Sequence, residues 1–146
     1  MIDLDNQTSL VVELSPLQKI ASSLSTKDVE LIIVNDDMMI ELNLKYRGKE
    51  QTTDVLSFPI EVPYTVESIH GLPLGSIIIS SSHVISKANE LKHGTQNELS
   101  LLFIHGMLHL LDFDHETDSG EMREQEEMII RDFNLPTSLI IRTTKE

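Results

Sequence analysis

The chain has 146 residues, of which 40% are hydrophobic, so it can bury a core and is not a disordered tail or linker. Its 24 acidic and 11 basic residues give a formal charge of −13. This charge excludes a uniformly basic nucleic-acid-binding surface, although not a local basic site. Because the chain has no cysteine, disulfides and thiolate ligands are excluded, and His, Asp and Glu remain as candidate metal ligands.

The N-terminus and the most apolar segment bear on the cellular location of the protein. The start, MIDLDNQTS, lacks the basic region and apolar run of a signal peptide. Residues 99–111 are too short to span a bilayer. We therefore expect a cytoplasmic protein with no membrane association.

No repeat, low-complexity tract or linker interrupts the chain, so we expect one domain over residues 1–146. Periodicity, caps and turn residues predict nine elements. In chain order they are a strand at 9–14, a helix from Ser15, a strand at 29–34, a helix from Asp36 to Tyr46 or Arg47, strands at 53–59 and 74–80, a helix from Ser81 stopped by Gly94, a helix from Thr95 to about Leu110, and a helix from Asp118 to near Phe133. Mixed strands and helices in this order suggest an α/β or α+β layered domain.

Several residues are expected to fix the helix ends. Ser15 would cap the first helix, with Pro16 at its first position, where the missing N–H costs nothing. Gly48 is placed to end the second helix, which Asn35 would cap. The segments 95–98 and 118–121 each have the spacing of a capping box.

Three of the six histidines lie in the run HGMLHLLDFDH, from His105 to His115. His105 and His109 are one helical turn apart, so their rings project from the same face of the predicted helix. That helix is apolar nearly all round and is therefore expected to be buried, where two imidazoles need partners. His70, His83 and His93 have no comparable surroundings.

A divalent metal would satisfy both rings, and His115 could return beyond a chain reversal as the third ligand. Three neutral imidazoles leave a tetrahedral zinc ion with one open position, which is typical of catalytic sites. A water in that position would have its pKa lowered toward ~7. The alternative is that His105 and His109 are core histidines bonded to backbone carbonyls, but spacing and burial together favour metal binding. We expect one Zn²⁺ ion, and nickel or another borderline cation would also suit three imidazoles.

Two neighbouring residues bear on this site. Gly106 lies inside a helix, which costs about 1 kcal/mol relative to Ala and suggests close approach by a metal, a substrate or another backbone. Asp114 could orient a ligand imidazole, or it could bond its own backbone in a turn. Asp112 is a further candidate to orient a ligand imidazole. Metzincin proteases share the histidine spacing but carry a Glu directly after the first His, so Gly106 argues against a peptidase.

The segment instead resembles the YbeY family of bacterial endoribonucleases, whose signature is HGxLHLxGYDH. NLKYRGKEQTTDVLSFP at residues 43–59 and LGSIIIS at residues 74–80 agree with the same family in order and approximate spacing. The resemblance implies that His105, His109 and His115 hold the metal, and that Arg47 is the functional arginine. It also implies a small mixed four-stranded β-sheet with one antiparallel strand, flanked by about five helices, with a metal cleft.

The sequence departs from the family pattern at two positions. Asp112 replaces the usual Gly between the second and third histidines, and Ser76 replaces the acid of LGD. If that Gly has a left-handed conformation, Asp can adopt it at some cost, and the fold survives. Position 76 therefore has no acid that could orient ligands or contact substrate.

Arg47 is the basis for a phosphodiester substrate. It lies in the densest basic cluster of the chain, with Lys45 and Lys49. A guanidinium can hold two phosphate oxygens and oppose charge that develops at phosphorus. Taken alone, the cluster also fits an ordinary helix C-terminus, where cations complement the helix dipole.

The resemblance implies a zinc-dependent endoribonuclease specific for single-stranded RNA, with Arg47 and His109 in the catalytic site. It further implies 16S rRNA 3′-end maturation and ribosome quality control, with ribosomal RNA, the small ribosomal subunit and an Era-type GTPase as partners. A second hypothesis is a metal-stabilised assembly factor that docks on the ribosome without hydrolytic activity. The departures at Asp112 and Ser76 leave room for it.

Overall fold

The computed structural model describes residues 1–60, 72–114, 116–136 and 139. The elements within these residues are, in chain order, β1 (Ile2–Asn6), α1 (Leu14–Leu24), β2 (Val29–Val34), α2 (Asp36–Arg47), β3 (Val55–Pro59), β4 (Gly75–Ser80), α3 (Ser81–Leu91), α4 (Thr95–Leu110) and α5 (Glu121–Asp132). The strands form one sheet in the order β1-β2-β4-β3, in which β3 alone runs antiparallel to its neighbour. The predicted mixed four-stranded sheet with five helices is confirmed for the described residues.

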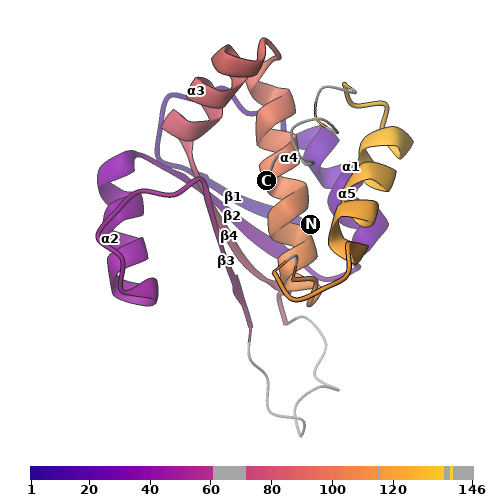
Figure 1. The fold of residues 1–146 in the computed structure, drawn as a ribbon, viewed down its shortest axis with the longest axis horizontal. Helices are drawn as coiled ribbons and strands as arrows, with labels where there is room; N and C mark the ends of the chain where they lie inside the picture. The colour runs from indigo at the N-terminus through magenta and orange to yellow at the C-terminus, as the bar shows by residue number, and fades with distance from the viewer. Residues whose placement is uncertain (61–71, 115, 137–138, 140–146) are drawn as a thin grey trace, which may run out of the picture.

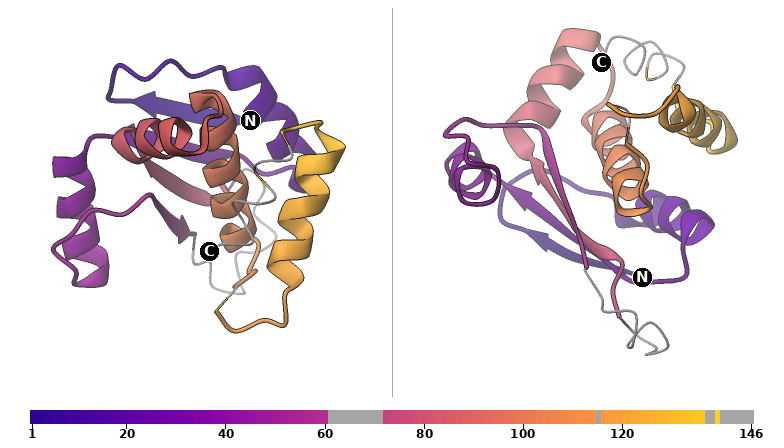
Figure 2. Two further views of the ribbon diagram at one scale, coloured as in Figure 1. Left: turned by 45° about the horizontal axis from the view of Figure 1, so that its top comes forward. Right: turned by 60° about the horizontal axis from the view of Figure 1, so that its bottom comes forward.

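The helices cover the two faces of the sheet unequally, as Figures 1 and 2 show. One face packs against α1 and α4, and α5 lies on the outer side of α4. The opposite face is covered by α2, whose Met39 packs on Val34, Leu56 and Ile78. Strand β3 is an edge strand between these two layers, so it borders both α2 and α4.

Helix α4 is the centre of the core, as its apolar sequence predicts. Eleven of its residues are buried, and its neighbours on the sheet include Ile77 of β4. A Cβ atom on Gly106 would lie only 2.7 Å from Cγ2 of Ile77, so the close packing of α4 on β4 requires glycine here. The expectation that a metal, a substrate or another backbone approaches Gly106 is therefore wrong, because the side chain of Ile77 occupies that position.

The first strand lies earlier than predicted. Residues 9–14 form no strand, and β1 is built from Ile2–Asn6 instead. Within β1 the apolar Ile2 and Leu4 face the core, while Asp3 and Asp5 are exposed. Pairing with β2 in a parallel ladder supplies the backbone hydrogen bonds of β1, whereas Leu10 and Glu13 of the 9–14 segment bond to side chains.

The predicted starts of α1 and α4 are also displaced. Helix α1 begins at Leu14 and has Glu13 as its N-cap, so Ser15 is not the cap; Pro16 occupies the third position, where the N–H is still unneeded. Helix α4 has Gly94 as its N-cap, since Thr95 is already helical. Glu98 therefore does not reach back to a cap. Its carboxylate lies 3.0 Å from Nε2 of buried His93.

The last helix starts later and α3 ends earlier than expected. Helix α5 begins at Glu121 with Gly120 as its N-cap, yet Asp118 still accepts hydrogen bonds from the N–H groups of Gly120 and Met122. Helix α3 ends at Leu91, and the left-handed Lys92 precedes the predicted stop at Gly94. In both cases the residue that borders the helix, Gly120 or Lys92, has a left-handed conformation and so sets the helix end.

The predicted ends of α2 are confirmed. Asn35 accepts a hydrogen bond from the backbone N–H of Met38 at 2.9 Å, and Gly48 adopts a left-handed conformation with φ of 71°. Arg47 is thereby fixed as the last helical residue, at the edge of β3. No helix in the described ranges has both the length and the apolar character needed to cross a membrane.

A cluster around Asp36 joins the N-termini of α2 and α3 to the loop before β3. Oδ1 of Asp36 accepts hydrogen bonds from Ser82 at 2.5 Å, Ser80 at 3.2 Å and Thr52 at 3.3 Å. The bond from Ser82 is the main cause that lowers the pKa of Asp36 below its usual value of 3.8, against an opposing effect of burial. Ser80, Thr52 and the nearby His83 lower this pKa further.

This cluster predicts a pH-dependent contribution to stability. Because the folded carboxyl of Asp36 has the lower pKa, its stabilisation is complete above the unfolded pKa and is lost as pH falls through the folded one. We expect Asp36→Asn to lower the free energy of unfolding at pH 7 by at most about 1 kcal/mol, since the side chain is half-exposed. Urea unfolding at pH 7 and near pH 3 measures this, with the neighbouring Asp37→Asn as control. A difference from wild type that is as large at pH 3 as at pH 7 would contradict it.

Candidate functional site

A pocket of about 720 Å³ lies where the second half of α4 faces the edge strand β3. Its walls come from the end of α2, from residues 53–59, from α4 and from the loop after α4. The lining residues are Arg47, Thr53, Asp54, Val55, Leu56, Ser57, Phe58, Pro59, His105, His109, Asp112, Phe113, Asp114 and Glu116. The structure therefore brings Arg47, His105, His109, Asp112 and Asp114, all predicted site residues, into one cavity.

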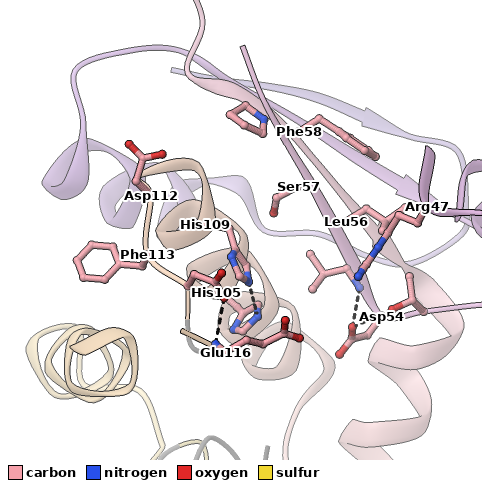
Figure 3. A pocket seen from close by; sticks show the side chains of 14 residues that line it. Arg47, Asp54, Leu56, Ser57, Phe58, His105, His109, Asp112, Phe113 and Glu116 are labelled. Atoms are coloured by element: carbon pink, nitrogen blue, oxygen red, sulfur yellow. Dashed lines mark hydrogen bonds between the residues drawn. The ribbon is translucent and has the colours of Figure 1, made fainter. Parts of the chain in front are cut away.

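His105 and His109 lie together in this pocket (Figure 3). Their Nε2 atoms are 3.1 Å apart, and the ring planes are inclined at 78°. A hydroxyl of Ser57 on β3 donates to the carbonyl of Gly106 at 3.3 Å and joins the two walls of the pocket at this level. The two imidazoles therefore direct the same ring nitrogen toward one point.

The orientation of His105 is set by a residue that the sequence analysis missed. Nδ1 of His105 lies 2.7 Å from Oε1 of Glu126, which comes from α5 and is buried. A carboxylate at this distance accepts a hydrogen bond from Nδ1–H, so Nε2 carries no proton and its lone pair is directed into the pocket. Glu126 thus selects the tautomer that a metal ligand requires.

The sequence does contain a signal for Glu126. It lies in the buried stripe of α5, between Met122 and the pair Ile129 and Ile130, at spacings of four, three and four residues. A carboxylate inside an apolar stripe needs a polar partner in the core. Residues 112–127 contain eight acids, most of them ordinary surface residues, so the sequence alone did not distinguish the buried Glu126 from the others.

The loop after α4 redirects the chain toward the pocket. The N–H of Asp112 donates to the carbonyl of His109 and the N–H of Phe113 to that of Leu108, which together form a Schellman motif. Asp112 holds the left-handed position of this motif, with φ of 71°. Asp112 therefore adopts the left-handed conformation that we considered for the glycine of the family signature.

Asp114 and Glu116 of this loop also line the pocket. Oδ1 of Asp114 accepts a hydrogen bond from the N–H of Glu116 at 3.0 Å, so the predicted turn role of Asp114 is present. His115 and His70 lie outside the described residues. Among the residues that are described, no three His, Asp or Glu side chains form a cluster suited to a metal ion. The third ligand therefore stays a prediction.

Arg47 reaches the pocket from the wall opposite the histidines (Figure 3). It is exposed, and it ends α2 together with Lys45, so it also fits the helix-dipole interpretation. The two interpretations are compatible, because the left-handed Gly48 stops the helix where the guanidinium can enter the pocket. Lys49 is likewise exposed beyond this end.

Ser76, His83 and His93 lie outside the pocket. The hydroxyl of Ser76 donates to Glu30 of the neighbouring strand at 2.8 Å, and Ser76 does not line the pocket. His83 belongs to the Asp36 cluster, and His93 is buried beside Glu98 at the other end of α4. Neither histidine lines the pocket, in agreement with the sequence analysis.

The pocket's donors fit a divalent cation. Two nitrogen ligands of a tetrahedral zinc ion, with bonds of about 2.0–2.1 Å, are separated by about 3.3 Å. The observed separation of 3.1 Å between the two Nε2 atoms is close to this value. Four carboxylates also line the pocket against the one guanidinium of Arg47, so its charge without a cation is negative. The carboxylates are Asp54, Asp112, Asp114 and Glu116.

Comparison with known proteins gives the family. The family model described as Endoribonuclease YbeY matches residues 3–134. This chain belongs to the YbeY family of endoribonucleases. Curated YbeY proteins of Sulfurovum sp. (strain NBC37-1) and Sulfurimonas denitrificans are 54% and 53% identical to it, over 142 and 144 residues. These matches cover 97% of both chains in the first case, and 98% of this chain and 99% of the relative in the second.

Two further comparisons agree with the YbeY assignment. The YbeY protein of Campylobacter jejuni (strain RM1221) is 54% identical over 130 residues, which is 89% of this chain and 93% of the relative. A solution structure from Thermotoga maritima superposes with a TM-score of 0.60 at 27% identity, covering 91% of this chain and 89% of that one. The YbeY family match confirms the resemblance and extends it to the first 40 residues. As a YbeY endoribonuclease, the protein belongs to a family of nucleases that act on RNA.

Proposed function

We propose that this protein is a zinc-dependent, single-strand-specific endoribonuclease of the cytoplasm that acts in 16S rRNA 3′-end maturation and ribosome quality control. The observation that carries the proposal is the arrangement of the pocket. The paired Nε2 atoms of His105 and His109 lie in the same cavity that Arg47 enters from the opposite wall. We assign His105, His109 and His115 as the ligands of one Zn²⁺ ion.

The charge of the pocket supports a requirement for metal. A phosphodiester is an anion, and four carboxylates beside one guanidinium would repel it. A divalent cation held by neutral imidazoles adds two positive charges without adding another anion. When bound, zinc would polarise the phosphate and activate a nucleophile near neutral pH.

The chain's own residues prepare the substrate for cleavage. Arg47 can hold two phosphate oxygens and oppose the charge that develops at phosphorus in the transition state. Glu126 keeps the Nδ1–H tautomer of His105 and so maintains its Nε2 as a donor to the metal. The hydrogen bond from Ser57 to the Gly106 carbonyl holds β3 against α4, which fixes the width of the pocket between these groups.

The departures from the family signature are consistent with hydrolysis. Asp112 preserves the left-handed turn after which residues 112–114 and Glu116 line the pocket. Ser76 lies outside the pocket, paired with Glu30, so the loss of an acid there leaves the proposed catalytic groups unchanged. Both observations favour an enzyme over a docking factor without activity.

The acidic surface suggests that partners deliver the substrate. With a formal charge of −13, the protein repels RNA outside the pocket. We propose that the small ribosomal subunit, together with an Era-type GTPase, brings single-stranded ribosomal RNA to the site. Intrinsic affinity for RNA then matters less than this targeting.

Cleavage of a labelled single-stranded rRNA fragment by the zinc-loaded protein, beside Arg47→Ala, tests the proposal. We expect wild type to cut and Arg47→Ala to cut about 10²-fold more slowly at saturating RNA, because a group that stabilises transition-state charge is lost. Lys87→Ala, which removes a cation of α3 away from the pocket, is the control and should cut like wild type. A wild-type protein that binds zinc but cuts nothing, alone or with ribosomal subunits, would instead support the docking factor.

A further inference from the structure

An aromatic pair, the exposed Tyr46 and the half-buried Phe58, lies at the rim of the pocket, beside Arg47. Tyr46, in the last turn of α2, is 55% exposed. Its ring centroid is 5.0 Å from that of Phe58 on β3, with the planes inclined at 53°. Phe58 itself lines the pocket, so the pair extends the cavity across the edge strand toward the end of α2.

This pair is not needed to complete the core. Phe58 already packs against the cluster of Met39, Leu56 and Ile78 that joins α2 to the sheet. Tyr46 adds its ring on the outer side, where more than half of the side chain stays in water. The chain contains only four Phe and two Tyr residues, so two of its six aromatic rings lie together on this rim.

The charges around the pair indicate a polyanionic ligand. Lys45 places its Nζ 5.1 Å from the centroid of the Tyr46 ring. Arg47 directly follows Tyr46 in the chain and lines the pocket, and Lys49 is exposed two residues further on. In a chain of formal charge −13, three cations within five residues beside two aromatic rings match the chemistry of single-stranded nucleic acid, which offers phosphates and unpaired bases together.

We propose that Tyr46 and Phe58 form a base-stacking subsite for single-stranded RNA. It holds the base of a nucleotide adjoining the phosphate that Arg47 contacts. This inference rests on the proposed ribonuclease function and adds to it a reason for strand selectivity. A base in a duplex is already stacked on both faces, whereas an unpaired base can stack on the exposed Tyr46 ring. Because every base has a stacking face, the subsite tolerates all sequences.

Steady-state cleavage of a 12-nucleotide single-stranded rRNA fragment by the zinc-loaded protein tests this subsite. We expect Tyr46→Leu, which keeps an apolar side chain but loses the ring, to raise KM about tenfold with kcat little changed, because the ring contributes to binding throughout the reaction. Tyr46→Phe should retain the wild-type KM, and Tyr46→Trp should lower it. Leu44→Ala, on the same helix and 47% exposed, is the matched control and should leave KM unchanged.

An abasic oligonucleotide of the same length, used as a competitive inhibitor, separates stacking from phosphate binding. Wild type and Tyr46→Leu should bind it equally, because it has phosphates but no bases. An unchanged KM in Tyr46→Leu, or an equal loss of affinity for the abasic inhibitor, would overturn the subsite while leaving the nuclease intact. If wild type neither binds nor cleaves RNA, the proposed function and the subsite both fail.

Discussion

Replacing His109 with alanine is expected to abolish both zinc binding and RNA cleavage. The substitution removes one of two Nε2 donors that lie 3.1 Å apart and leaves only two of the three proposed ligands, too few to hold the ion in a catalytic zinc site. We expect cleavage of the single-stranded rRNA fragment to fall by about 10³-fold or more, because the metal's contribution to the transition state is lost entirely. Bound zinc per chain, measured by equilibrium dialysis, should fall with it.

The paired design separates the enzyme from contaminating nucleases. His83→Ala, prepared in the same way, removes a histidine of α3 outside the pocket and should keep both zinc and activity. Equal cleavage by wild type and His109→Ala would identify the activity as contamination. Full zinc binding by His109→Ala would remove this histidine from the ligand set and contradict the proposed site.

The parts of the fold that were predictable are those whose sequence signals are local. Helix α4 is long and apolar all round, and the turn of helix between His105 and His109 fixes their shared face whatever surrounds them. The limits of α2 follow from the cap at Asn35 and the left-handed Gly48, both of which act within a few residues. These signals also located Arg47 at the end of its helix.

The features that were missed depend on contacts between distant segments. Strand β1 exists because Ile2 and Leu4 pair alongside β2, a partner some 27 residues away, and the more apolar run at 9–14 has no such partner. The sequence alone does not predict that Arg47 and the histidines, some 60 residues apart, line the same pocket. They do so because β3 is an edge strand that lies between α2 and α4. Glu126 acquires its role only when α5 packs on α4.

Glu126→Leu is expected to weaken zinc binding about 10- to 100-fold, as is typical when the partner of a ligand histidine is removed. Without an acceptor for its Nδ1–H, the ring of His105 can rotate or take the other tautomer, in which Nε2 carries the proton. Glu126→Gln keeps an acceptor oxygen but loses the charge, so its affinity for zinc should lie between those of Glu126→Leu and wild type. Glu124→Leu, an exposed position on the same helix, is the control and should bind zinc like wild type.

A purely structural role for Glu126 predicts a different pattern. Removing only the carboxylate leaves the buried Nδ1–H of His105 without this acceptor, so Glu126→Leu should lower the stability of the metal-free protein by about 1–3 kcal/mol under either role, and stability alone does not separate them. Zinc affinity from competition with a chelating dye, together with the imidazole ¹⁵N shifts of His105, reports positioning directly. If zinc affinity and the His105 tautomer are unchanged in Glu126→Leu, Glu126 serves only the packing of α5 on α4. A loss of both, in a protein that remains folded, is the result that our assignment requires.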